Sequence, residues 1–231
     1  MEISPDNIII WQWGFIVLNA TILYTWLVMA ILVLGSWWVT RHLSVEPQMS
    51  PWQNGLEIIV NTINTQIRGA AQQDPSKFLP LVGTLFLFIA LANILTIFPV
   101  YESPAGSLST TAALALWVFV AVPWFGIRNS GLKGYLKHFI QPSPFMLPFQ
   151  IISEISRTIS LAVRLFGNVM STSLLVAILL SIVPLFFPAV MRIFGVLVGV
   201  IQAYVFAILT LVYIASGMQA QKQTQQHQEN G

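Results

Sequence analysis

Long apolar stretches without a single charged side chain are the feature that most constrains this chain. Residues 8–40, 78–100 and 165–191 contain no Asp, Glu, Lys or Arg. A helix needs about 20 consecutive, mostly apolar residues to cross a bilayer. Only 8% of the 231 residues are charged, whereas a soluble domain carries about 25%. The sequence therefore predicts an all-α integral membrane protein with about five membrane helices.

The spacing of the apolar stretches suggests one membrane domain over residues 1–231. We expect a first span over 8–39, with tryptophans at both ends as an aromatic belt. The second and third spans are expected within 78–127, the third interrupted near its end by Pro123. The last apolar part, 142–218, is expected to form a helical hairpin.

The first arm of this hairpin is too long for an upright membrane helix. Residues 148–183 would form a helix of about 54 Å, while the hydrocarbon layer is about 30 Å thick. The arm must therefore tilt or extend outside the hydrocarbon layer. Pro184 and Pro188 mark the turn, and residues 189–216 form the partner helix. We interpret the pair as a long, tilted hairpin.

The polar segments indicate the orientation of the chain. Residues 128–141 read as a basic loop, which by the positive-inside rule faces the cytoplasm. Alternation places the N-terminus outside and the polar tail, 219–231, in the cytoplasm as a solvated, disordered end. Residues 51–71 show apolar side chains every three or four positions on the cytoplasmic side. They read as an amphipathic helix at the membrane surface or against a soluble partner, or as an ordinary connecting helix.

Several classes of function find no support in the residues. Cysteine is absent, and we find no phosphate-binding loop, no Ser-His-Asp set and no metal-ligand spacing. The histidines, His42, His138 and His227, fall in expected loops or tails. The net charge of +2 is too small to suggest nucleic acid. We expect no metal, no cofactor and no catalytic activity of the chain by itself.

Arg164 is a charge in the middle of the apolar hairpin. Its guanidinium stays protonated at any workable pH, and a permanent charge at mid-membrane costs at least about 2.5–3.5 kcal/mol. An intramembrane arginine therefore indicates a functional site on an ion or substrate path.

Five polar side chains share the helix edge of Arg164, within about 40° of its direction at 100° per residue. They are Ser153, Arg157, Ser160, Asn168 and Ser171. Glu154 precedes Arg157 by one turn and can pair with it. After Arg164 the next acid is Glu229, in the tail. Arg164 then either pairs with another helix to fix packing, or faces a passing ion or a partner outside the chain.

The partner helix carries two further signals. Gly195 and Gly199 are spaced to permit a close approach between membrane helices. Gln202 is the one strongly polar side chain of that span. It is either a hydrogen-bond donor in packing or part of the polar site of Arg164.

These residues resemble a known family. The runs RLFGN at 164–168, QAYVF at 202–206 and LTLVYI at 209–214 are similar to those of the a subunit of rotary F-type ATP synthases. Glu154 and Arg157 occupy the places of acidic and basic residues of that family, and the likeness covers roughly residues 50–216.

The resemblance implies an ion-translocating stator subunit of an ATP synthase, in the plasma (inner) membrane of a prokaryote. Its partners would be the c-ring, the b-type peripheral stalk subunits, the rest of the complex and the lipid bilayer. Two offset half-channels would carry H⁺ or Na⁺, and the arginine would face the carboxylates of the c-ring. The implied path includes Arg164, Asn168 and Gln202, and further Ser160, Ser171, Glu154 and Arg157.

The sequence departs from the family pattern where titratable groups are common. Ser173 stands at the place of a carboxylate, and Gly195 at the place of a polar or ionisable residue. Ser107 and Ser109 replace an Asp and an Asn. One half-channel would then conduct through hydroxyls, amides and water, or carry a hydrated metal ion. These losses resemble the divergent N-type branch, often associated with sodium.

Two other functions remain open from the residues. A stand-alone secondary transporter or channel would use Arg164 to bind an anionic substrate, and it would be expected to show internal repeats with broken helices. We find no convincing repeat. A purely structural membrane anchor would leave the polar helix edge unexplained.

Overall fold

The structure is a computed structural model, and the five long helices among its described residues confirm the predicted all-α membrane class. All five are long and apolar enough to cross a membrane. The described residues are 9–13, 16–41, 57–58, 61–62, 64–65, 69, 78–98, 101–140, 145–183 and 186–229.

A short antiparallel pair of strands precedes the first helix. Strand β1, Ile9–Trp13, pairs with β2, Ile16–Asn19, and helix α1, Ala20–Thr40, follows at once. The expected first span, 8–39, therefore begins as helix only at Ala20. The preceding residues are mostly β-branched or aromatic, and such side chains favour an extended backbone.

The second and third spans lie where the sequence predicts them. Helix α3, Leu79–Ile94, ends in the 3₁₀ turn η3, Leu95–Ile97. A second 3₁₀ turn, η4, Pro104–Gly106, leads into helix α4, Leu108–Ile140. Pro123 lies inside α4 and does not end it, contrary to the expected interruption.

The expected basic loop, 128–141, is wrong as a loop, because α4 continues through it to Ile140. Gly131 has φ +73° and kinks the helix there. Only glycine adopts that conformation without steric cost. The chain changes direction at Gly131 and then resumes helical turns.

The C-terminal hairpin consists of α5, Met146–Ile182, and α6, Phe187–Glu229. The 37 residues of α5 correspond to about 55 Å at 1.5 Å per residue. Helix α6 extends through most of 219–231, so the expected disorder of the tail is wrong as far as Glu229, where the helix ends. Gln, Lys, Glu and Ala are abundant there, and all favour helix.

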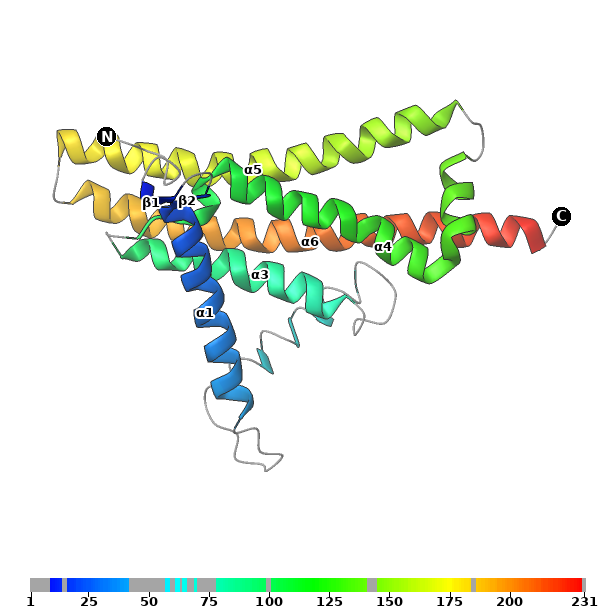
Figure 1. Ribbon diagram of the computed structural model, residues 1–231, viewed down its shortest axis with the longest axis horizontal. Coiled ribbons are helices and arrows are strands. Elements are labelled where there is room, and N and C mark those ends of the chain that lie inside the picture. Colours follow the sequence, from blue (N-terminus) through cyan, green and yellow to red (C-terminus); the bar gives the residue numbers. More distant parts are fainter. Residues whose placement is uncertain are drawn as a thin grey trace.

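Figure 1 shows α5 and α6 side by side along the long axis of the molecule, while α1 runs crosswise to them. Helix α6 packs on α3, α4 and α5. Buried side chains from all four helices form the core, among them Ile89, Val118, Leu165 and Phe206. If α1 stands upright in a bilayer, the hairpin lies inclined to it, as its length requires.

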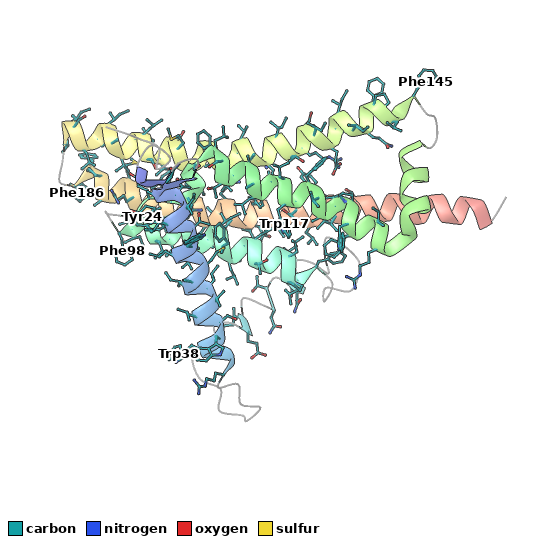
Figure 2. All side chains as sticks on the ribbon, viewed as in Figure 1. Tyr24, Trp38, Phe98, Trp117, Phe145 and Phe186 are labelled. Carbon is teal, nitrogen blue, oxygen red and sulfur yellow. The ribbon has the colours of Figure 1, made fainter. Side chains whose placement is uncertain are left out.

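Large apolar side chains cover the outer surface of the helices. The aromatic side chains labelled in Figure 2 include Trp38, Trp117, Phe145 and Phe186, and all four are exposed. Exposed apolar surface on this scale is typical of helices that face lipid.

Most of the expected amphipathic helix, 51–71, lies outside the described residues. Its described positions, 57–58, 61–62, 64–65 and 69, are helical. Thr62 and Thr65 each donate a hydrogen bond to the carbonyl oxygen four residues earlier, at 2.8 Å. The side chains of His42, His138 and His227 also lie outside the described part.

Candidate functional site

Arg164 lies on the outward edge of α5 and is exposed. Leu161 and Leu165 are fully buried on the adjacent face of the helix, about 60° and 100° around the axis from Arg164, and their packing helps to hold the arginine on the outer edge. Within the described part of the chain, the one ion pair is between Glu154 and Arg157. Arg164 therefore has no carboxylate partner among the described residues.

Two serines of the predicted site flank Arg164 on the same exposed edge. Ser160 lies one turn before Arg164 and Ser171 two turns after it, and both side chains are exposed. The polar edge predicted from the helical period is thus a continuous outer surface of α5.

Asn168 and Gln202 join the two arms of the hairpin. The side-chain amide of Asn168 donates a hydrogen bond to Oε1 of Gln202, at 2.9 Å. Gln202 is only 5% exposed, and its Nε2 has no hydrogen-bond partner. Asn168 follows Arg164 by one helical turn. The structure therefore brings Gln202 beside the polar edge of Arg164, where it accepts a hydrogen bond and leaves a donor free.

Glu154 and Arg157 form a separate group nearer the start of α5. Their side chains pair at 3.7 Å, as the three-residue spacing predicts. The guanidinium of Arg157 also lies over the ring of Tyr213 on α6, 5.3 Å from its centroid. The charges at this end of the hairpin therefore have partners inside the chain.

The two glycines of α6 lie where neighbouring helices come closest. A Cβ on Gly199 would lie 2.6 Å from Cβ of Asn93, and a Cβ on Gly195 would collide with the methyl group of Thr172. Asn93 donates hydrogen bonds to the carbonyl oxygens of Ile89, at 2.9 Å, and Gly199, at 3.3 Å. The predicted close approach at Gly195 and Gly199 is confirmed.

A cavity of about 230 Å³ lies beside these glycines. Asn168 and Ser173 line it from α5, and Gly195 lines it from α6. Liquid water takes about 30 Å³ per molecule, so the space is large enough for several water molecules. The cavity thus begins beside the Asn168–Gln202 pair and includes two of the positions that depart from the family pattern.

The sequence reasoning missed three residues that line the same cavity. Tyr101 and Glu102 come from the turn between α3 and α4, and Arg192 comes from α6. Burial raises the pKa of the Tyr101 phenol, with Tyr24 as a smaller cause. Burial also raises the pKa of Glu102, and the charge of Arg192 opposes that effect. The sequence does contain one signal for this group, because Glu102 is an acid in a short turn between two apolar spans.

Arg192 ties α6 to the end of α3. Its guanidinium donates hydrogen bonds to the carbonyl oxygens of Thr96, at 3.2 Å, and Phe98, at 3.4 Å. Carbonyl groups at a helix C-terminus attract cations. Backbone carbonyl groups, rather than an ion pair, therefore fix the position of the Arg192 guanidinium.

The family model for the ATP synthase A chain matches residues 22–215. The chain belongs to this family. An a subunit of Crocosphaera subtropica, "ATP synthase subunit a 1", is 72% identical over 222 residues, covering 96% of each chain. "ATP synthase subunit a 2" of Picosynechococcus sp. is 60% identical over the full length of both chains. "ATP synthase subunit a" of Albidiferax ferrireducens is 56% identical, covering 96% of each.

Family membership fixes the general role. The chain is the ion-translocating stator subunit a of an F-type ATP synthase and is a multi-pass membrane protein. It works as a part of the ATP synthase complex.

Proposed function

We propose that Arg164 faces the carboxylates of a rotating c-ring and separates two half-channels for H⁺ or Na⁺. The observation that carries this proposal is the exposed guanidinium on the outer edge of α5, which pairs with no acid among the described residues. A charge that faces the membrane interior without a partner is costly, so its partner is expected on a neighbouring subunit in the membrane. A carboxylate that passes on the ring meets this requirement.

The chemistry follows from the fixed charge. A cation close to a carboxylate lowers the pKa of that carboxylate. A ring carboxylate opposite Arg164 therefore releases its ion before it moves past. The same positive charge repels cations, so an ion cannot pass directly from one half-channel to the other without turning the ring.

The other predicted site residues extend this path along α5. Ser160 and Ser171 offer hydroxyl groups beside the ring on either side of Arg164. Asn168 and Gln202 form the amide pair at the inner end of the cavity. Glu154 and Arg157 supply the charged groups of the opposite half-channel. Hydroxyl, amide and charged side chains can all pass a cation or hold the water that conducts it.

We further propose that the chain has no catalytic activity by itself and binds the c-ring and b-type stalk subunits within the complex. The basic segment that begins at Arg128 is expected on the cytoplasmic side of a prokaryotic plasma membrane. The C-terminus then also lies in the cytoplasm, and the N-terminus outside. The cavity near Glu102 consequently opens to the outside.

The coupling ion is either H⁺ or Na⁺. Ser173 and Gly195 line the cavity, so two positions that are ionisable or polar in many relatives offer no titratable group. Membership of the sodium-associated N-type branch stays a prediction. Dependence of ATP hydrolysis on Na⁺, with protection of the ring carboxylate from carbodiimide by Na⁺, identifies sodium. Absence of both identifies protons.

The decisive variant is Arg164→Ala in the complete complex. ATP-driven ion pumping into vesicles is expected to disappear, because the ring carboxylate loses its fixed counter-charge, while the complex still assembles. Intact pumping by Arg164→Ala would refute the proposal. A stand-alone transporter, the other candidate, would instead move an anionic substrate as the purified chain in liposomes, which we do not expect.

A further inference from the structure

The cavity on the outer half of α5 and α6 contains an acid that the family comparison does not assign. Glu102 reaches it from the turn between α3 and α4 and is half-buried. Its Oε2 is buried and has no hydrogen-bond partner, and the hydroxyl of Tyr101 is in the same situation. Buried polar atoms without a protein partner are normally satisfied by water or an ion.

A third unpartnered atom lies beyond the other end of the cavity. Nε2 of Gln202 is buried without an acceptor, while Oε1 of Gln202 binds Asn168, which lines the cavity. A cavity that holds a carboxylate and has a free amide donor beside its Asn168 wall has polar groups that can hold water and pass a cation through it.

We propose that Glu102 is the ionisable entrance group of the outer half-channel, which passes a monovalent cation, H⁺ or Na⁺, towards Asn168. This inference rests on the proposed function, since it supplies the carboxylate that Ser173 and Gly195 lack. In the proton case, the carboxylate of Glu102 accepts a proton from hydronium, leaves water behind, and releases the proton to water inside the cavity. In the sodium case no covalent bond changes, and the carboxylate attracts the hydrated ion.

The charged and titratable groups around Glu102 are consistent with this role. They are Tyr101 beside it, Tyr24 of α1 against Tyr101, and Arg192 of α6. The guanidinium of Arg192 is bound by two carbonyl oxygens at the end of α3. Burial and Arg192 shift the pKa of Glu102 in opposite directions. Burial is the larger effect, so the pKa of Glu102 is raised and the carboxylate accepts a proton more readily than a free one.

The test uses the complete ATP synthase in vesicles, with ATP-driven H⁺ and Na⁺ transport measured in separate arms. Glu102→Gln is expected to lower pumping of the coupling ion about tenfold, the lower end of what a charged group in a cleft contributes. Glu102→Asp should restore most of the activity. Glu57→Gln, the same change at an exposed acid, should pump like the unaltered complex. The arm that responds identifies the ion.

A second readout separates an ionic role from a structural one. The chain contains no cysteine, so Val198→Cys places a single thiol in the cavity wall. We expect impermeant thiosulfonate reagents added outside to label it, and to leave the exposed, lipid-facing control Leu197→Cys unlabelled. Adding Glu102→Gln should slow a cationic reagent severalfold relative to a neutral reagent of equal size.

The outcomes distinguish the two proposals. Normal pumping by Glu102→Gln, beside complete loss in Arg164→Ala, overturns the role of Glu102 and leaves the proposed function intact. Reduced pumping that Glu102→Asp fails to restore, with an unchanged ratio of cationic to neutral labelling, also overturns it as a structural effect. Normal pumping by Arg164→Ala refutes the proposed function itself.

Discussion

The two ends of the hairpin, on either side of Arg164, differ in the partners of their ionisable side chains. Towards the start of α5, the charges of Glu154 and Arg157 pair with each other, and Arg157 also lies over Tyr213. Towards the turn, a cavity contains a carboxylate oxygen and a phenol hydroxyl that have no protein partner. At one end the two charged side chains pair within the chain, and at the other a carboxylate and a phenol are left open to water or an ion.

This difference suggests that the two half-channels conduct by different means. At the cavity end, Gly195 and Gly199 let neighbouring helices approach closely, and the cavity lies beside this contact. At the paired end, an ion must compete with an existing salt bridge. Each prediction below disturbs one end and leaves the other as the reference.

Gly199→Ala should have the largest effect, because it disturbs the packing around the cavity. The added Cβ would lie 2.6 Å from Cβ of Asn93, and overpacking of this kind costs about 1–3 kcal/mol. We expect the amount of assembled complex to fall severalfold and pumping to be nearly lost. Gly83→Ala on α3 is the matched control, since its Cβ meets nothing within 4 Å. Equal assembly of both variants would contradict the tight packing at Gly199.

Gln202→Leu should have the next largest effect. It removes the acceptor of Asn168, and a buried amide left unsatisfied costs about 1–3 kcal/mol. Pumping is expected to fall about tenfold at that cost. The double variant Asn168→Leu/Gln202→Leu should recover assembly but not pumping, because both amides of the path are then missing. Recovery of pumping in the double variant would show that the pair serves packing alone.

Glu154→Gln should have the smallest effect. The side chains of Glu154 and Arg157 are 22% and 44% exposed, and exposed ion pairs contribute about 0–1 kcal/mol. Pumping should therefore fall by no more than about fivefold, the rate equivalent of the upper end of that range. Glu154→Asp is the conservative control. A loss as large as that of Gln202→Leu would show that the paired end also limits ion flow.

Much of this arrangement follows from sequence patterns that repeat along a helix. The apolar stretches predict the five spans, and the helical period places Arg164, Ser160 and Ser171 on one edge. The pair Glu154–Arg157 follows from its spacing alone. Such features are local, so a single sequence contains the information that determines them.

The features that the sequence did not predict depend on contacts between distant segments. Glu102 and Arg192 meet at one cavity only because the turn after α3 lies against α6. The change of direction within α4 depends on one unusual backbone conformation at Gly131. The sequence did not predict that α1 begins at Ala20, because the β-branched and aromatic residues of the two preceding strands are as apolar as those of a membrane helix.

The central claim is that the exposed edge of α5 around Arg164 meets the c-ring carboxylates. Because the chain lacks cysteine, Ser160→Cys and Ser171→Cys can each be tested for oxidative cross-linking to a cysteine one turn from the ring carboxylate. The account predicts cross-links from both serine positions and none from Ile159→Cys, which is exposed on the other side of α5. Cross-linking from Ile159→Cys, and from neither serine position, would contradict it.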